Sequence, residues 1–278
     1  MKIIRNLKIE AKEQDILADL FLKKSHRKEL LIFCHGFKGF KDWGAWDLVA
    51  KEFAEAGYVF LKFNFSENGI GQENLSEFNR LDLFEQNNYS KEIRDLKLLL
   101  KEIRKSAFWQ EEKLEKIHLI GHSRGGGIAA VVASEEQEIA SLITWASIAS
   151  FDRFGSEENI AQWKQEGSKN FYNSRTQQDM KISFQFYEDY AENKERLNIE
   201  ACVKNLAKPM LIIHGTADEA VGFSHAQRLK NWKPDAELFL IENANHVFGA
   251  SHPYCLEKLP QDLNSLVEKS ISWLKSGV

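Results

Sequence analysis

Hydrophobic and polar residues alternate along the first part of the chain. The stretches KIIRNLKIE and ILADLFLKK both show this alternation, and between them lies AKEQD. Polar, turn-forming residues between two alternating runs are typical of a hairpin connection. The pattern therefore predicts that the chain opens with two antiparallel strands.

After this hairpin, short apolar runs take turns with segments of helical period. Six further strands are predicted at ELLIFC, YVFLKFNF, KIHLI, IASLITWASIAS, PMLIIHG and AELFLIE. Helical spacing is found between them, at residues 46–57, 83–105, 125–136, 223–232 and 263–277. Right-handed crossovers through such helices favour parallel strands, so we expect an α/β fold with an eight-stranded, mostly parallel sheet and helices on both faces.

The alternation stops for about fifty residues after Phe151. We therefore expect a core formed by residues 1–150 and 208–278, with residues 151–207 as a small cap insertion. Within the insertion, a hairpin is predicted at 172–184 and mainly helix at 187–206. Its aromatic side chains could line a pocket, but a unit this small also needs them for its own core, and the core interpretation is favoured.

Composition and charge exclude several classes of function. The formal net charge is −4 in 278 residues, so no basic field is available for nucleic acid. We find no run of about 18 apolar residues for a membrane span and no apolar segment typical of a secretion signal. Cys34, Cys202 and Cys255 are widely spaced and suggest neither a disulfide framework nor a metal site. These features predict a soluble, cytoplasmic protein.

The most informative motif is GHSRG, residues 121–125, which matches G-x-S-x-G directly between a predicted strand and a predicted helix. In this setting the serine lies on a turn so tight that side chains two residues away would collide with neighbouring backbone, which explains Gly121 and Gly125. Ser123 then points outward at a helix N-terminus, where unpaired N–H groups favour negative charge on a bound oxygen. The motif therefore predicts that Ser123 is a catalytic nucleophile.

Four motifs together give the chain a clear resemblance. HGFKG follows the third strand, GHSRGG lies at the tight turn, HGTAD follows the seventh strand and NANH follows the eighth. In this order they resemble the α/β-hydrolase superfamily, and specifically its esterase and serine-aminopeptidase-like branch with a small cap. The resemblance covers nearly the whole chain and implies that the insertion lies over the active site.

A serine hydroxyl needs a base to accept its proton and an acid to orient that base. His246 lies just beyond the last predicted strand, where the family places its base, and Asp218 follows the seventh strand, where the family places its acid. His252 is the alternative base, and its simpler interpretation is a surface loop residue. Glu219 and Asp152 are the alternative acids. The chain has Gly222 where the family often has proline, so the shape of this loop is less well predicted.

The carbonyl oxygen of an attacked ester becomes negatively charged and needs two hydrogen-bond donors. The resemblance implies that the backbone N–H groups of Phe37 and Arg124 form this oxyanion hole. Backbone donors tolerate any side chain, so we expect the Phe37 ring and the Arg124 guanidinium to serve packing or to face solvent.

These expectations combine into a serine hydrolase that cleaves carboxylic esters of small to medium acyl or aryl-acyl groups through an acyl-enzyme. Its only predicted partner is a small-molecule ester, and the chemistry requires no cofactor and no metal. A serine aminopeptidase or amidase uses the same machinery and is the main alternative. A non-catalytic binding module with a hydrolase fold is a third interpretation.

Overall fold

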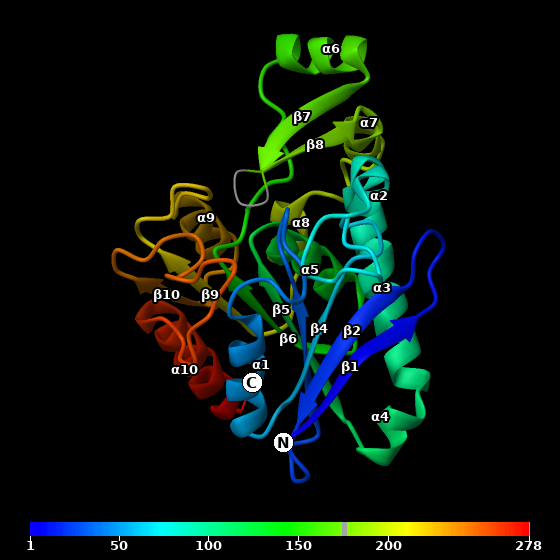
Figure 1. Ribbon diagram of the computed structural model, residues 1–278. Coiled ribbons are helices and arrows are strands. Elements are labelled where there is room, and N and C mark those ends of the chain that lie inside the picture. The colour runs from blue at the N-terminus through cyan, green and yellow to red at the C-terminus, as the bar shows by residue number, and fades with distance from the viewer. Residues whose placement is uncertain (174–176, 278) are drawn as a thin grey trace.

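Eight strands form one central sheet in the computed structural model, which describes residues 1–173 and 177–277. These strands are Lys2–Ile9 (β1), Ile16–Leu22 (β2), Glu29–Cys34 (β3), Val59–Phe63 (β4), Lys116–His122 (β5), Ile139–Trp145 (β6), Met210–Gly215 (β9) and Glu237–Ile241 (β10). Their order across the sheet is β1-β2-β4-β3-β5-β6-β9-β10 (Figure 1). The sheet has the eight strands that the sequence predicts.

The direction in which the strands pair determines which loops lie at the same edge of the sheet. β1 pairs antiparallel with β2, and β2 pairs antiparallel with β4. All the other neighbours pair in parallel, which confirms the prediction of a mostly parallel sheet. The carboxyl ends of β3, β5, β9 and β10 therefore meet at one edge of the sheet, and β5 lies near its middle. In open α/β sheets this edge is where ligands bind.

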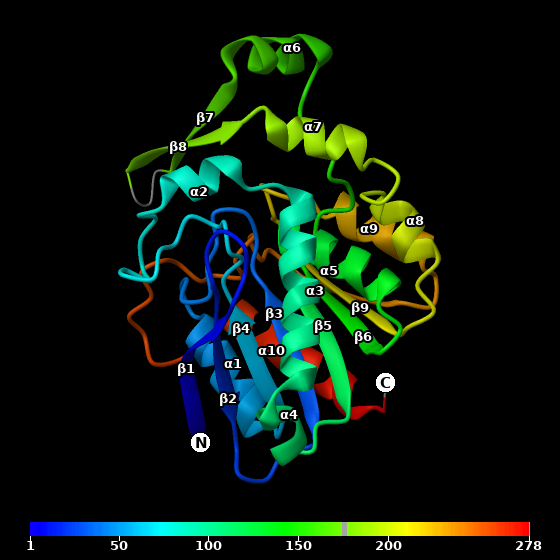
Figure 2. The ribbon, with the colours of Figure 1, turned by 90° about the vertical axis from the view of Figure 1, so that its right-hand side faces the viewer.

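Helices cover both faces of the sheet. The helices are Trp46–Glu55 (α1), Leu81–Gln86 (α2), Tyr89–Lys105 (α3), Ala107–Glu111 (α4), Arg124–Glu135 (α5), Glu157–Glu166 (α6), Gln185–Glu192 (α7), Ile199–Lys204 (α8), Ser224–Trp232 (α9) and Gln261–Lys275 (α10). α1 and α10 contact each other on one face, while α3, α5, α8 and α9 form a connected layer on the other (Figure 2). Within the described ranges, no helix combines the length and apolar character that crossing a membrane requires.

The sequence predicts one helix over residues 83–105, and this prediction is wrong in one respect. The segment forms two helices, α2 and α3, because Asn87 and Asn88 both have extended backbone, with ψ of 152° and 175°. The Asn88 side chain accepts a hydrogen bond from Lys91 N at 2.9 Å and so caps α3. Gln185 of α7 bonds to the same junction, through its Oε1 to Asn88 Nδ2 and its Nε2 to Asn87 O.

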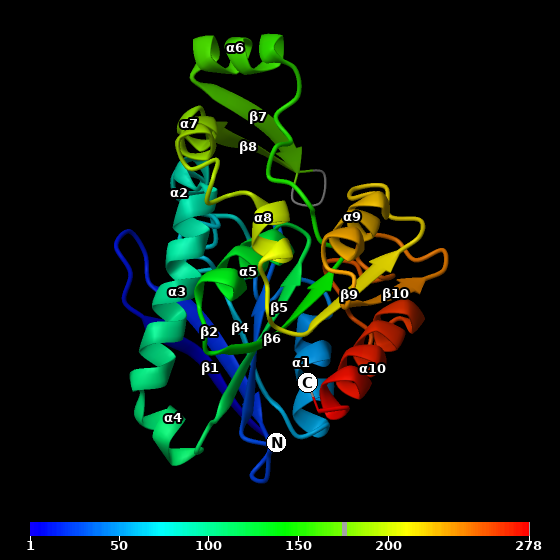
Figure 3. The ribbon, with the colours of Figure 1, turned by 180° about the vertical axis from the view of Figure 1, so that it is seen from behind.

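Residues 151–207, here called the insertion segment, lie between β6 and β9. They contain α6, the antiparallel strands Ser168–Asn173 (β7) and Gln178–Ser183 (β8), and the helices α7 and α8. The predicted hairpin and the predicted helices are therefore present, although residues 174–176 of the hairpin lie outside the described residues. α6, β7 and β8 rise beyond the carboxyl edge of the sheet, and α8 lies against α5 (Figure 3). The division into core and cap domains stays a prediction.

Candidate active site

Ser123 occupies a strained turn between β5 and α5. Its φ of 57° and ψ of −121° lie where L-residues are rare, and strain of this kind gathers at functional sites. Serine at a helix N-cap normally bonds to the first turn, but the Ser123 side chain forms no capping hydrogen bond. The backbone holds the turn instead, since Ser123 N donates to Trp145 O at 2.9 Å and Ser123 O accepts from Gly126 N at 3.0 Å. The hydroxyl is left for another role.

Close approach of the backbone explains the glycines around this serine. A Cβ on Gly121 would lie 2.4 Å from Gly125 O. A Cβ on Gly125 would lie 2.3 Å from Cys34 O and 2.4 Å from His35 O. Both distances are far below van der Waals contact, so a side chain would push β5 and α5 away from β3. The steric explanation proposed from the sequence is confirmed.

The turn after β3 lies directly against the serine. A Cβ on Gly36 would be only 2.8 Å from Ser123 Cβ and 3.3 Å from Ser123 Oγ. The next residue is Phe37, and its backbone N–H donates no hydrogen bond to another described residue. The same holds for the backbone N–H of Arg124, the first residue of α5, where helical N–H groups lack partners. Two amide donors are therefore available on either side of Ser123.

His246 and Asp218 meet in a hydrogen bond at the carboxyl edge of the sheet. His246 Nδ1 lies 2.7 Å from Asp218 Oδ2, although the two residues come from different loops, after β10 and after β9. Because a carboxylate only accepts, Nδ1 carries the proton and donates it. In the neutral ring Nε2 then has a free lone pair, which is the state that a general base requires.

Asp218 is held as an ionised carboxylate. Its burial acts to raise the pKa, but the hydrogen bonds from His214 and His246 outweigh burial and hold the pKa well below its usual range. The other carboxylate oxygen, Oδ1, accepts from the backbone N–H groups of Ala220 and Val221 at 3.0 and 2.8 Å. These four contacts fix the orientation of the carboxylate towards the imidazole.

Two further histidines support this arrangement. His122 Nε2 donates to the backbone carbonyl of His246 at 2.9 Å, and burial lowers the pKa of His122 to about 3, so its ring is neutral. His214 Nε2 lies 2.7 Å from Val221 O and 3.3 Å from Asp218 Oδ2. No motif in the sequence indicates that His214 also contacts Asp218.

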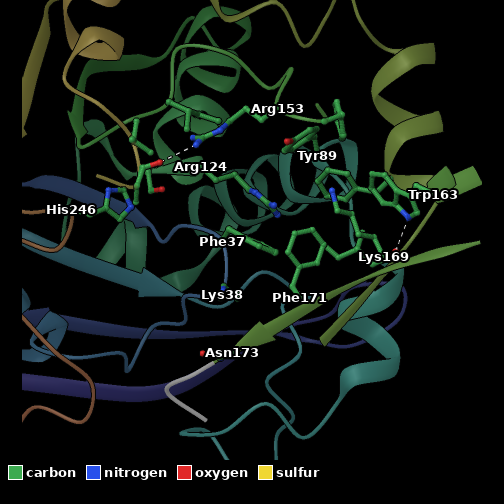
Figure 4. A pocket seen from close by; sticks show the side chains of 17 residues that line it. Phe37, Lys38, Tyr89, Arg124, Arg153, Trp163, Lys169, Phe171, Asn173 and His246 are labelled. Atoms are coloured by element: carbon green, nitrogen blue, oxygen red, sulfur yellow. Dashed lines mark hydrogen bonds between the residues drawn. The ribbon is translucent and has the colours of Figure 1, made fainter. Parts of the chain in front are cut away.

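Ser123 and His246 line the same cavity, which has a volume of about 490 Å³. They also both line a smaller cavity of about 60 Å³. Among the described residues, Ser123 Oγ forms no hydrogen bond with the imidazole. Such bonds are often long without substrate and shorten in the complex. The walls of the larger cavity come from the core and from the insertion segment, and its aromatic side chains include Phe37, Tyr89 and Phe171 (Figure 4).

The alternative base and acids lie elsewhere. His252 lies in a loop and is partly exposed, in agreement with its simpler interpretation as a surface loop residue. Its Nδ1 accepts a hydrogen bond from Gly44 N at 3.0 Å, and its ring packs on Phe40 and Trp43. Glu219 and Asp152 are exposed, and within the described residues neither forms a hydrogen bond or ion pair with His246.

The Arg124 side chain serves packing, one of the two roles that the sequence analysis allows for it. The side chain is only 11% exposed, and its guanidinium lies over the rings of Phe37, Phe186 and Tyr89, with 4.1, 5.1 and 5.3 Å to the centroids. It also donates to Glu92 Oε1 at 3.3 Å. Of the two expected roles, packing is therefore the one observed. Glu92 lies 32 residues earlier on α3, so nothing local in the sequence indicates this ion pair.

Three carboxylates elsewhere have ligand oxygens within 4.8 Å of one another and could in principle hold a metal ion: Asp19, Asp42 and Asp47. The amino groups of two lysines form ion pairs with these carboxylates. Lys41 Nζ lies 3.0 Å from Asp19 Oδ2, and Lys62 Nζ lies 3.3 Å from the same oxygen and 2.6 Å from Asp47 Oδ1. The cluster is an ion-pair network between β2, β4 and α1, away from Ser123.

Comparison with known proteins agrees with this architecture. The sequence profile of the family described as alpha/beta hydrolase fold matches residues 29–196, which is more than half of the chain. A protein named putative esterase/lipase 2 from Mycoplasma pneumoniae is 30% identical over 121 residues. That match spans 43% of this chain and only 38% of the relative.

Solved structures resemble the chain over nearly its whole length. Est1E from Butyrivibrio proteoclasticus, with bound ferulic acid, has a TM-score of 0.74 at 20% identity and covers 97% of this chain and 98% of its own. A monoacylglycerol lipase from Paleococcus ferrophilus has a TM-score of 0.66 at 16% identity, covering 94% of this chain and 98% of its own. Identities this low show the fold alone, and together with the profile they show that the chain belongs to the alpha/beta hydrolase fold family.

Proposed function

We propose that the protein is a serine hydrolase that cleaves carboxylic esters, with Ser123 as nucleophile, His246 as base and Asp218 as the acid that orients it. The observation that carries the proposal is the hydrogen bond of 2.7 Å between His246 Nδ1 and Asp218 Oδ2, beside a cavity that Ser123 also lines. The strained backbone of Ser123 is typical of a nucleophile presented on a tight turn.

The first half of the reaction forms an acyl-enzyme. His246 Nε2 takes the proton of Ser123 Oγ while Oγ attacks the ester carbonyl carbon, and the carbonyl oxygen becomes an oxyanion. The N–H groups of Phe37 and Arg124 donate to this oxyanion. The imidazolium is stabilised by the ionised Asp218 and then gives its proton to the departing alcohol oxygen as the ester bond breaks.

The second half returns the enzyme to its starting state. A water molecule gives one proton to His246 Nε2 and attacks the acyl carbon, and the same two amides hold the second oxyanion. When the bond to Ser123 Oγ breaks, the imidazolium returns its proton to Oγ and the carboxylic acid leaves. Water is the only co-reactant, so the sequence of steps balances without a cofactor.

The cavity supports small to medium acyl or aryl-acyl groups. Its volume of about 490 Å³ falls in the range of sites for small molecules, roughly 300–1,000 Å³. Phe154, Trp163 and Phe186 of the insertion segment line it and also pack against one another. The two interpretations of these aromatic residues are therefore compatible, since the same rings can form the core of the segment and the wall of a pocket.

Esters and amides distinguish this proposal from the peptidase alternative. We expect the purified protein to hydrolyse 4-nitrophenyl esters with acyl chains of two to eight carbons and to leave aminoacyl 4-nitroanilides nearly intact. The reason is that an amide nitrogen is a poorer leaving group and must be protonated as it departs. Initial rates of nitrophenol and nitroaniline release, measured against Ser123→Ala protein as the blank, provide the comparison. Turnover of anilides alone would favour the peptidase, and turnover of neither would contradict a hydrolase.

A further inference from the structure

The charge of the cavity is strongly one-sided. Among the described residues that line it, four are cationic and none is Asp or Glu; the cations are Lys38, Arg124, Arg153 and Lys169. They come from different elements, with Arg124 at the start of α5, Arg153 after β6 and Lys169 on β7, and they approach the same space (Figure 4). A cavity lined by one sign of charge attracts and holds the opposite sign.

Arg124 differs from the other cations of the cavity because its side chain is buried. A charged side chain that is only 11% exposed has lost most of its hydration and must recover that free energy from neighbours. Three aromatic faces and Glu92 supply part of it. Of the five N–H donors, the described residues engage only one, the Nη1 hydrogen bond to Glu92 Oε1. The others remain available to a ligand in the cavity.

Glu92 is the ion-pair partner of Arg124, but it comes from α3, is itself buried and is not among the residues that line the cavity. Arg153 and Lys169 add charge at the exposed rim. Arg153 Nη2 donates to the backbone carbonyl of Ala220 at 2.9 Å, and Lys169 Nζ lies 5.7 Å from the Phe171 ring. Neither cation forms an ion pair with a carboxylate in the described part of the chain.

We propose that the substrate is an ester whose acyl group bears a carboxylate, which is bound in the cavity by the Arg124 guanidinium with Arg153 and Lys169 at the rim. A planar guanidinium can bind a carboxylate through two parallel N–H donors. Arg124 directly follows Ser123, so the anion lies close to the scissile carbonyl, as in a monoester of a short dicarboxylic acid. This inference rests on the proposed ester hydrolysis and adds the charge of the substrate to it.

The test compares three ethyl esters of the same length that differ in terminal charge: monoethyl glutarate, ethyl 5-amino-5-oxopentanoate and ethyl 5-aminopentanoate. We expect kcat/KM for the anionic ester to exceed that for the neutral amide by roughly 10- to 100-fold, because hydrogen bonds to charged groups contribute about 1.5–3 kcal/mol. The cationic ester should be the poorest substrate. Ethanol release followed by nuclear magnetic resonance gives the three rates.

Variants show whether the preference comes from the proposed residues. Arg124→Gln keeps the backbone N–H and should reduce the ratio of anionic to neutral kcat/KM to below about threefold. Arg153→Gln, at an exposed position, should reduce the ratio less, and it serves as the second variant if Arg124→Gln does not fold. Arg27→Gln is the matched control, because Arg27 is exposed beside Gly57 and Tyr58 at the opposite end of the sheet, and its ratio should equal that of the wild type.

Binding separates this inference from the proposed reaction. Ser123→Ala protein should bind monoethyl glutarate about tenfold more tightly than the neutral amide in calorimetry, whether or not the wild type turns either ester over. Equal binding of the anionic ester and the neutral amide would overturn the anion site. So would a preference for the anionic ester that is as large in the Arg124→Gln and Arg153→Gln proteins as in the wild type. Tighter binding of the anion without turnover of any ester would keep the anion site and reject the hydrolase.

Discussion

Ser123→Ala is expected to reduce kcat for 4-nitrophenyl ester hydrolysis by about a million-fold, the scale seen when a triad nucleophile is removed. The physical reason is that the acyl-enzyme can no longer form, so only the amide donors and binding assist the attack of water. The fold should be unaffected, because Ala keeps the Cβ and the hydroxyl forms no capping hydrogen bond. Stopped assays over long times, together with thermal unfolding of the same protein, measure both quantities.

The His246→Ala protein and the double variant provide the control for this result. His246→Ala alone should cost about as much as Ser123→Ala, and the Ser123→Ala/His246→Ala protein should be scarcely worse than either, since members of a triad act as a unit. If the two losses multiplied, the two side chains would be acting independently, and a shared proton transfer would be excluded.

Asp218→Asn is expected to reduce kcat by roughly ten-thousandfold. An asparagine can still accept from Val221 N–H through its Oδ1, so the loop should keep its shape. Its Nδ2 would instead donate to His246 Nδ1, which moves the ring proton to Nε2. A protonated Nε2 cannot accept the proton of Ser123, and the imidazolium would also lose its counter-charge.

The exposed neighbour Glu219 supplies a matched control for this carboxylate. Glu219→Gln removes the same charge one residue away and should leave kcat within about twofold, because its side chain is exposed. In the wild type, the lowered pKa of Asp218 means that this group stays ionised as the pH falls through the ordinary value of about 3.9. Loss of activity above that pH should therefore come from another group. Equal losses in the Asp218→Asn and Glu219→Gln proteins would contradict the assignment.

Much of the fold is predicted by local pattern, because the pattern reflects burial. Strands buried on both faces are mostly apolar, as β3 (ELLIFC) and β9 (MLIIHG) are. The tight turn at Gly121 and Gly125 can be predicted from the sequence because these two positions leave no room for a side chain. The break between α2 and α3 is not predicted, because the helical period continues across Asn87 and Asn88 and the hydrogen bonds of Gln185 to that junction come from far along the chain.

The candidate site also contains residues that the sequence predicts and residues that it does not. The sequence order of the loops predicts Ser123, Asp218 and His246, and the structure brings the last two into contact. The pairing of Arg124 with Glu92 and its enclosure by aromatic rings were not predictable, because they depend on how α3, α5 and the insertion segment pack. Local motifs indicate the residues that we propose for the chemistry, whereas the residues that we propose bind the substrate come together only in the tertiary structure.

The most direct test of the central claim is covalent labelling with a fluorophosphonate, followed by mass spectrometry of peptides. A nucleophile beside a base and an oxyanion hole displaces fluoride from such a reagent and keeps the phosphonyl group. We predict one adduct per chain, on the peptide that contains Ser123, and no adduct in the Ser123→Ala protein. An unlabelled Ser123 in folded protein, or labelling of another residue that persists in Ser123→Ala, would contradict the account.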